Sequence, residues 1–358
     1  MGFKCGLVGM PNVGKSSIFN LLTKQTIPAN NYPFCTIDPN KALVEVPDTR
    51  LNKLADINNS EKVINTSIEF VDIAGLIKGA SKGEGLGNEF LSHINSTEVI
   101  AHVVRFFEDK DIIHVKEKHN PIEDFIDINL ELILSDLNSI EKYIANAKKG
   151  RKDNKDRSAI INELEDLMNH LSEDKFASSY NFSPHLAEVT DLKLLTNKPM
   201  FIIANKNDKT NNDDLLDFKN NIDPNIPLVS IDVKLEEDIN ELDEDDRKEF
   251  LTELGVSDSA LKRVIKTGYD LLGLKTFFTS GPKETRAWSA KKEFNARDCS
   301  GIIHTDIKKG FIRAETVSYA DYIVNNGEQG SKLSGVWRQE GKDYLVKEGD
   351  VIYFRFNI

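Results

Sequence analysis

The stretch GMPNVGKS (residues 9–16) decides how the rest of this chain is interpreted. It fits the pattern GxxxxGK[ST] in full, and it lies between an apolar run at residues 3–9 and a helical pattern that begins at Lys15. Glycines in such a loop let backbone N–H groups turn towards a phosphate, and the helix N-terminus favours negative charge. The sequence therefore predicts a phosphate-binding loop between the first strand and the first helix of an α/β domain.

The side chains of this loop have distinct expected roles. Lys15 would reach the β- and γ-phosphates of a nucleotide, and the Ser16 hydroxyl would ligate Mg²⁺. A chance Gly-rich turn is the alternative, and the strand and helix that flank the loop argue against it. The expected nucleotide contacts of the loop are Asn12, Val13, Gly14, Lys15, Ser16 and Ser17.

Two further segments have the spacing of an NTPase whose loops respond to the γ-phosphate. Asp72 and Gly75 end an apolar run, so Asp72 could hold the Mg²⁺ shell while the Gly75 amide meets the γ-phosphate. Thr36 lies between the phosphate loop and that run, where a threonine that closes on Mg²⁺ belongs. Ser16, Thr36 and Asp72 are therefore the expected metal ligands.

The residue that would orient the attacking water is not the usual one. Many GTPases carry a glutamine directly after Asp-x-x-Gly, and this chain has Leu76 there. Either hydrolysis is slow, or another polar group reaches the γ-phosphate. His114 could position water as a neutral imidazole, although a lone histidine often has only a surface or packing role. The candidate catalytic groups are His114, Lys15 and Gly75.

The stretch FIIANKNDK (residues 201–209) is where a base would be read. An Asp208 carboxylate can accept from guanine N1–H and N2–H₂, a donor pair that adenine lacks, while Lys206 would lie against the base and sugar. Asn205 and Val233 complete the expected base contacts. Asp232-Val233-Lys234 departs from the Ser-Ala-Lys-like segment of guanine sites, so the choice between ATP and GTP stays open.

Apolar runs that alternate with helical patterns predict a mostly parallel α/β sheet. Its expected strands are residues 3–9, 41–46, 67–75, 98–107, 201–205 and 227–232. Leucines and isoleucines at alternating spacings of four and three then predict two facing helices, an antiparallel coiled-coil hairpin. The expected seam is Ile126, Leu130, Ile133, Leu137, Ile140 and Ile144 on one helix and Ile160, Leu164, Leu167 and Leu171 on the other.

The turn between these helices (residues 148–157) carries six Lys or Arg side chains. A solubilising turn and a contact to ribosomal or other RNA both fit this charge. From about Gly281 the sequence predicts a small β-rich module, with strands within residues 302–315, 316–324 and 343–356.

Length and composition set limits on function. The 358 residues, of which 39% are hydrophobic and 29% charged, allow two or three globular domains. A formal net charge of −12 argues against coating of nucleic acid, and we expect no specific DNA binding. We also expect no membrane span, no leader and reduced thiols at the three cysteines, as in a cytoplasmic protein.

Several stretches together resemble the YchF/Obg-like ATPases of the translation-factor class of P-loop NTPases, from one end of the chain to the other. They are GLVGMPNVGKSSIFNLLT (6–23), NYPFCTIDPN (31–40), DIAGLIKGASKGEGLGNEFL (72–91), FFTSGPKETRAW (277–288), IHTDIKKGFIRAE (303–315) and EGKDYLVKEGDVIYFRFN (340–357). The resemblance implies an OBG-type G domain (1–120 and 198–280), an inserted coiled-coil arm (121–197) and a β-grasp-like TGS domain (281–358).

The resemblance also implies a slow, Mg²⁺-dependent ATPase that binds the ribosome, as the large subunit or the 70S particle, and acts as a switch in translation and stress responses. It implies assistance to hydrolysis by His114 and K⁺ binding at Asn12. The basic arm tip and the TGS domain are the expected ribosome contacts. The family usually has Asn-x-x-Glu where this chain has Asn205 to Asp208. A GTP-specific ribosome-associated GTPase, which Asp208 favours, and a nucleotide-gated scaffold with negligible hydrolysis, which Leu76 favours, are the alternatives.

Overall fold

The computed structural model of the chain describes most of its 358 residues. The described residues are 3–25, 40–73, 86–108, 120–149, 155–184, 186, 192–256 and 258–357. Thr36, Gly75, Leu76 and His114, for which the sequence predicts roles in the switch and in hydrolysis, lie outside them.

The chain divides into two compact units. The first contains Met1–Val44 and Glu69–Gly268, and the second contains Glu45–Ile68 and Tyr269–Ile358. A segment from the first fifth of the sequence thus folds with the C-terminal end. The chain enters this segment within strand β2 (Lys41–Val46) and leaves it within β4 (Thr66–Asp72). The three-domain division expected from the sequence stays a prediction.

The first unit is built on a six-stranded sheet in the order β2-β4-β1-β5-β6-β7. Besides β2 and β4, its strands are β1 (Phe3–Val8), β5 (Val99–Arg105), β6 (Met200–Asn205) and β7 (Leu228–Ile231). β1, β5, β6 and β7 pair in parallel, with Val8 opposite His102 and Asn205 opposite both Arg105 and Ile231. Their C-terminal ends therefore meet at one edge, where ligands bind in parallel sheets. The predicted α/β fold is confirmed.

Helices connect these strands, and polar side chains cap several of them. They are α1 (Lys15–Lys24), α3 (Leu86–Asn95), α7 (Asn212–Asn221), α8 (Val233–Glu241), α9 (Glu244–Glu253) and α10 (Ala260–Leu271). Asn211, Asp232 and Asp243 accept backbone N–H groups at the starts of α7, α8 and α9. The buried Glu236 carboxylate accepts the N–H groups of Ala260 at 2.6 Å and Leu261 at 3.3 Å, which ties α8 to the start of α10.

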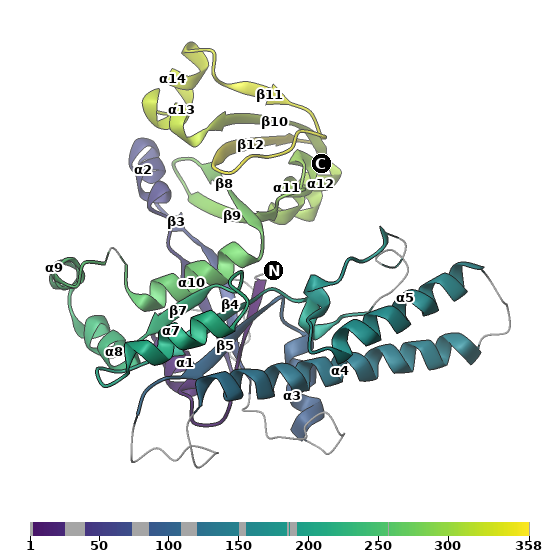
Figure 1. The fold of residues 1–358 in the computed structure, drawn as a ribbon. Coiled ribbons are helices and arrows are strands. Elements are labelled where there is room, and N and C mark those ends of the chain that lie inside the picture. The colour runs from purple at the N-terminus through teal and green to yellow at the C-terminus, as the bar shows by residue number, and fades with distance from the viewer. Residues whose placement is uncertain are drawn as a thin grey trace. The chain divides into compact units, whose positions relative to one another are not determined.

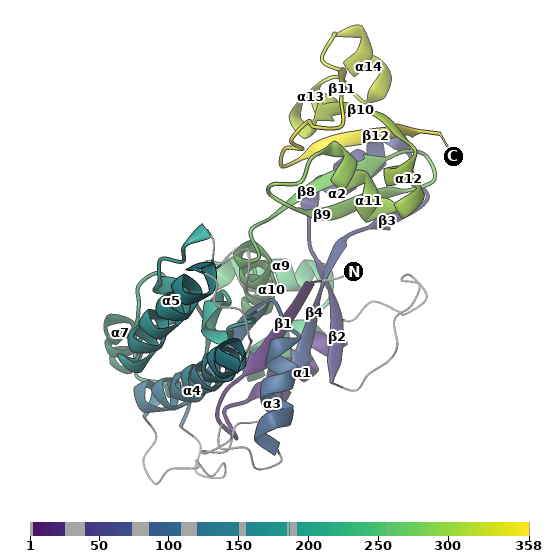
Figure 2. The same cartoon turned by 90° about the vertical axis from the view of Figure 1, so that its right-hand side faces the viewer.

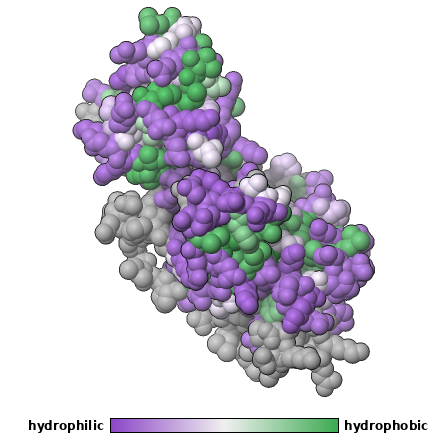
Figure 3. Space-filling view, turned by 90° about the vertical axis from the view of Figure 1, so that its left-hand side faces the viewer, coloured by the Kyte–Doolittle hydropathy of each residue, from purple (hydrophilic) through white to green (hydrophobic). Residues whose placement is uncertain are grey.

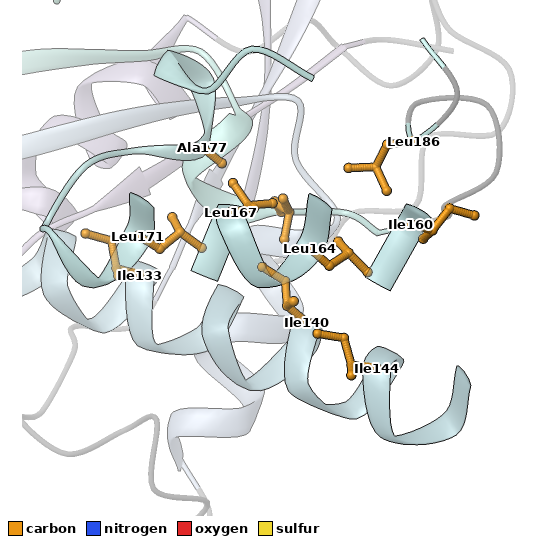
Figure 4. Close-up of a cluster of buried hydrophobic side chains, with 10 residues drawn as sticks. Ile133, Ile140, Ile144, Ile160, Leu164, Leu167, Leu171, Ala177 and Leu186 are labelled. Atoms are coloured by element: carbon orange, nitrogen blue, oxygen red, sulfur yellow. The ribbon is translucent and has the colours of Figure 1, made fainter. Parts of the chain in front are cut away.

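The inserted helices α4 (Pro121–Lys149) and α5 (Lys155–Ser172) form the predicted hairpin (Figures 1 and 2). Their facing side chains pack into one buried cluster, joined by Ala177 from the short helix η3 (Ala177–Ser179) (Figure 4). At the base of the hairpin, the Asp136 carboxylate accepts the backbone N–H groups of Leu195 and Thr196 at 2.7 and 2.8 Å, both in the short helix η4 (Leu195–Asn197). The cluster comprises Ile133, Ile140, Ile144, Ile160, Leu164, Leu167, Leu171, Ala177, Leu186 and Leu194.

The predicted seam is wrong at its start, because Ile126 is 47% exposed. In this part of α4 the buried apolar side chains include Phe125, Ile128 and Leu132 instead. The Phe125 ring lies 4.9 Å from the His102 ring of β5 and 5.6 Å from the ring of Phe218 in α7. The N-terminal part of α4 thus packs on the sheet unit and not on α5, so a different face of the helix is buried there.

The second unit is a six-stranded sheet in the order β11-β10-β12-β8-β9-β3, crossed by short helices. Its strands are β3 (Val63–Ile64), β8 (Leu274–Ser280), β9 (Thr285–Lys291), β10 (Phe311–Ser318), β11 (Arg338–Glu340) and β12 (Asp350–Phe356). Its helices are α2 (Thr49–Asn58), α11 (Ala296–Ile303), α12 (Thr305–Lys309), α13 (Tyr319–Val324) and α14 (Glu328–Leu333).

Two of the strand predictions for this unit need correction. Residues 302–309 are largely helical, and residues 319–324 form α13. The Ser318 side chain accepts the Asp321 N–H at 3.1 Å, which is the first half of a helix-capping arrangement. This capping signal outweighs the β-branched and aromatic residues on which the strand prediction depended. The strand expected within residues 343–356 begins only at Asp350.

The segment 45–68 belongs to the core of the second unit. Leu51 and Leu54 of α2 are fully buried, and they pack in one cluster with Phe278, Val317 and Val351 from the sheet. Polar contacts add to this packing: Tyr322 Oη donates to Asn58 Oδ1 at 3.0 Å, and Ser60 Oγ donates to the Gly281 carbonyl at 2.8 Å. The sequence alone does not suggest this pairing of distant segments.

The face drawn in Figure 3 is mostly hydrophilic where residues are described, and hydrophobic residues gather there in smaller patches. Among the described residues, no helix combines the length and the apolarity that a crossing of a bilayer requires.

Candidate functional site

The phosphate loop follows β1 and has the backbone that its sequence predicts. Gly14 has φ 93°, and a Cβ atom there would lie 2.2 Å from the Asn205 Nδ2 atom. A Cβ atom on Gly9 would lie 2.4 Å from the Val103 carbonyl oxygen. Both positions therefore require glycine, one for its left-handed backbone and both for space.

Lys15 is buried at the start of α1, and its ammonium group is held by the loop itself. Nζ donates to the carbonyl oxygens of Gly9 at 2.9 Å and Met10 at 2.8 Å. Burial lowers the pKa of Lys15 to about 8, although the nearby Asp72 carboxylate acts in the opposite direction. Such a desolvated cation gains from a bound polyphosphate, because an anion would replace the hydration that the ammonium group lacks.

An oxygen pair lies beside this lysine. Ser16 Oγ is 3.4 Å from Asp72 Oδ2, and Asp72 Oδ1 is buried and has no hydrogen-bond partner among the residues that the structure describes. Burial raises the pKa of Asp72, and Lys15 and Ser16 offset part of that effect. A carboxylate oxygen that lacks a donor, next to a hydroxyl, suits a hard divalent cation with oxygen ligands. These two of the three expected metal ligands fit the group; the third, Thr36, lies outside the described residues.

Asn205 joins the base-reading segment to the phosphate loop. It ends β6, it is 4% exposed, and its Nδ2 atom donates to the Val13 carbonyl at 2.9 Å. Val13 contributes only its backbone carbonyl to this contact, and the residue is 1% exposed. The next residue follows the sheet, since the Lys206 N–H donates to the Ile231 carbonyl at 2.9 Å. The two motifs that the sequence places about 190 residues apart are thus in direct contact.

A cavity of about 730 Å³ in the first unit is lined by Lys15, Ser16 and Asn205, whereas Val13 and Asp72 are not among its lining residues. Its size suits a nucleotide-sized ligand. It confirms that the phosphate loop and the base-reading segment face the same space. The lining residues are Asn12, Gly14, Lys15, Ser16, Ser17, Phe107, Asn205, Lys206, Asn207, Asp232, Val233, Lys234 and Glu237.

Asp208, the predicted guanine reader, is exposed and does not line this cavity. Its neighbour Asn207 is oriented by the turn: its Oδ1 atom accepts from the Lys209 N–H at 3.2 Å and from the Thr210 hydroxyl at 3.2 Å. The part of the sequence that most suggests a guanine site thus contributes Asn205 to Asn207 to the lining, without the carboxylate that would distinguish guanine.

Phe107 and Glu237 line the cavity although the sequence did not suggest either. Phe107 lies just after β5, and the Arg105 guanidinium lies 4.2 Å from the centre of its ring. Arg105 Nε also donates to the Phe107 carbonyl at 3.1 Å. Glu237 sits in the second turn of α8, within an acidic run that is typical of a solvated helix face. The sequence therefore suggests an exposed Glu237, and only the position of α8 beside the phosphate loop shows that Glu237 lines the cavity.

Two family models match parts of the chain. Residues 4–134 match MMR_HSR1, described as a 50S ribosome-binding GTPase. Residues 274–357 match YchF-GTPase_C, described as a protein of unknown function.

Curated relatives match over the full length of both chains. Proteins named ribosome-binding ATPase YchF are 47% identical in Haemophilus influenzae, 49% in Escherichia coli O157:H7 and 46% in Bacillus subtilis. The solved structure of the Schizosaccharomyces pombe YchF GTPase superposes with a TM-score of 0.88 at 33% identity, and it covers 99% of this chain and 98% of its own.

Proposed function

The chain belongs to the YchF family of ribosome-binding ATPases, and from that premise we propose that it binds ATP in the 730 Å³ cavity, hydrolyses it slowly and binds the ribosome in a nucleotide-dependent way. The observation that carries this proposal is the union of Lys15, Ser16, Asn205 and Val233 in one cavity. A switch of this kind, acting in translation and stress responses on ribosomes, would work in the cytoplasm.

The residues of the loop provide the electrostatic part of the chemistry. Lys15 would place its ammonium group on the β- and γ-phosphates, and the helix N-terminus behind it would favour their negative charge. Ser16 and Asp72 would hold a divalent metal, which we propose to be Mg²⁺ and which supplies further countercharge when bound. The phosphate loop and Asp72 would thus supply the countercharge for the phosphates.

Orientation of the attacking water is the step that Leu76 cannot provide, and we assign it to His114. His114→Ala should lower ATP turnover at least tenfold while the Kd for ATP changes less than about twofold, because the histidine acts on water and not on the nucleotide. Steady-state turnover and equilibrium binding measure the two quantities. His304→Ala, an exposed histidine of the second unit, is the matched control. Equal turnover in His114→Ala and the wild type removes His114 from the mechanism.

Selection between ATP and GTP is open to direct measurement. The exposed position of Asp208 outside the cavity favours ATP, whereas the sequence Asn205 to Asp208 favours GTP. Measuring the Kd values of ATP and GTP for the wild type and for Asp208→Glu distinguishes an ATP preference from a GTP preference. We expect the ratio of the two Kd values to stay within about twofold in the variant. A large change in that ratio would support the alternative, a GTP-specific ribosome-associated GTPase.

Ribosome contact is proposed for the arm tip and the C-terminal module. Lys148 and Lys149 end α4, and Arg157 lies in the first turn of α5. Lys148 is 58% exposed beside Glu165, so its ion pair adds little and its charge stays available to a phosphate backbone. Lys148→Glu with Lys149→Glu should weaken co-sedimentation with ribosomes and make it less dependent on salt. An unchanged salt dependence excludes the tip as a contact.

Two further parts of the proposal depend on the resemblance alone. One is K⁺ as a second cofactor near Asn12, which lines the cavity. The other is the choice between the large subunit and the 70S particle as the binding partner. The alternative of a nucleotide-gated scaffold is based on Leu76, which cannot orient the attacking water. ATP turnover that stays at background in the presence of ribosomes would support the scaffold, and stimulated turnover would support the enzyme.

A further inference from the structure

Two carboxylates line the nucleotide cavity, and they differ in how they are engaged. The Asp232 side chain accepts the Leu235 N–H at 3.2 Å, which caps α8. Glu237 forms no hydrogen bond or ion pair with any residue that the structure describes, although it is only partly exposed. Its neighbour Glu236 is buried on another side of the helix, where it caps α10. Glu237 is thus the carboxylate of the lining that remains available to a ligand.

The position of Glu237 on α8 matches the size of a base. Glu237 follows Val233 by four residues and Lys234 by three, so it lies next to both on the helix surface, and all three line the cavity. Val233 and Lys234 are the first two residues of the helix, whose N–H groups have no partner within the helix. Glu237 lies four residues further on, about 6 Å along the axis at 1.5 Å per residue. This distance is close to the width of a purine.

These groups distinguish the two purines at position 6 of the ring. The N–H groups at the start of α8 can donate to a ring nitrogen or a carbonyl oxygen. A carboxylate beside them accepts from the 6-amino group of adenine, and it repels the 6-carbonyl oxygen of guanine, which has no proton to donate. Asp208, which would favour guanine, lies outside the cavity. Both observations point towards adenine.

We infer that Glu237 reads the 6-amino group of the base and is the residue of this chain that selects ATP over GTP. This inference rests on the proposed binding of a nucleotide in the cavity. Base selection is thereby assigned to a residue in the second turn of α8, and not to Asp208 in the segment that usually reads the base.

The experiment measures Kd for ATP, GTP and purine riboside triphosphate, which carries only hydrogen at position 6. Full-length wild type is compared with Glu237→Ala and Glu237→Gln by titration calorimetry. Glu237→Ala should weaken ATP binding about tenfold, as the loss of one charge-assisted hydrogen bond does, while purine riboside triphosphate stays within about twofold. Glu237→Gln should raise the affinity for GTP relative to ATP, because its amide can donate to the 6-carbonyl oxygen.

Asp238→Asn is the matched control, since Asp238 is an exposed neighbour on α8 that does not line the cavity. It should leave all three Kd values unchanged. If Glu237→Ala weakens ATP and purine riboside triphosphate by the same factor, or leaves ATP binding unchanged, the inference fails while the proposed function stands. If the wild type binds none of the three nucleotides, the proposed function fails as well.

Discussion

At the residue scale, Asn205 has the most consequential single contact in the site. Asn205 is the last residue of β6. Its side chain fills the space that a side chain on Gly14 would need, and its Nδ2 atom donates to the Val13 carbonyl of the phosphate loop. One amide thereby links the phosphate loop to the segment that we propose to read the base. A shift of either the Asn205 side chain or the Val13 carbonyl would break this hydrogen bond.

Asn205→Ala should therefore weaken ATP binding at least tenfold, because it leaves the buried Val13 carbonyl without its donor and frees the loop. The cost to the free energy of unfolding should be about 1–3 kcal/mol. Titration calorimetry and chemical denaturation measure the two effects. Asn221→Ala, at the exposed end of α7, should change neither. Full ATP affinity in Asn205→Ala would show that the loop does not depend on this bond.

Glu315 gives the second unit a dependence on pH. Its buried carboxylate accepts from Arg355 at 2.9 Å and from Arg313 at 3.0 Å, and these guanidinium groups lower the pKa of Glu315 to about 2 from its ordinary value of 4.5. Because the folded pKa lies below the unfolded one, this stability is present above pH 4.5 and is lost as the pH falls towards 2.

Glu315→Gln should therefore lower the free energy of unfolding by about 1–2 kcal/mol at pH 7, a value reduced because both arginines are partly exposed. The difference from the wild type should shrink between pH 4.5 and pH 2. Urea denaturation across this range measures it. A difference that stays constant with pH would contradict the assignment.

Residue identity predicted the phosphate loop well, because GxxxxGK[ST] requires local backbone geometry that the sequence itself encodes. It predicted the base contacts less well. Asn205, Lys206 and Val233 line the cavity as expected, whereas Asp208 is exposed. Whether a residue after a strand faces the ligand depends on the turn that follows, and here Asn207 and Thr210 set that turn.

At the element scale, α4 shows how one helix serves two partners. Near its start it buries Phe125 and Ile128 against the sheet unit, and further along it buries Ile140 and Ile144 against α5. A heptad pattern in the sequence identifies the helix and its hairpin correctly. It cannot show where the buried face changes, because that depends on which element lies opposite, as Ile126 illustrates.

Leu164→Ala and Ile126→Ala form a matched pair that tests this change of face. Leu164 is fully buried in the cluster between α4 and α5, so its truncation should destabilise the hairpin by about 2–5 kcal/mol. Ile126 is 47% exposed, so its truncation should cost less than about 1 kcal/mol. Hydrogen exchange of the α5 amides reports the hairpin directly. Similar losses in the two variants would place Ile126 in the seam.

At the scale of the whole molecule, the segment that contains α2 and β3 packs with the C-terminal sheet although it lies far from it in the sequence. The chain enters it just after the residues around Thr36 and leaves it within β4, the strand that ends at Asp72. Packing between residues more than 200 positions apart carries no local signal, so the sequence could not predict this grouping. The α/β class and the hairpin did carry such signals, since both depend on hydrophobic periodicity.

If α2 folds with the C-terminal unit, its amides should respond to mutations in that unit. Val351→Ala, in β12, should speed hydrogen exchange in α2 about as much as in β8. Val104→Ala, an equally buried valine in β5, should leave exchange in α2 unchanged. Faster exchange of the α2 amides in Val104→Ala, with no change in Val351→Ala, would assign α2 to the first unit.

The most direct test of the account is ATP turnover by the full-length wild type with and without 70S ribosomes, in K⁺ and Mg²⁺ and against Lys15→Ala. An ATPase that works on the ribosome should turn over ATP above background, should be stimulated clearly by ribosomes, and should lose this activity in Lys15→Ala, whose phosphate contact is gone. Turnover that stays at the level of Lys15→Ala, even with ribosomes present, would contradict the enzyme and leave a nucleotide-gated scaffold.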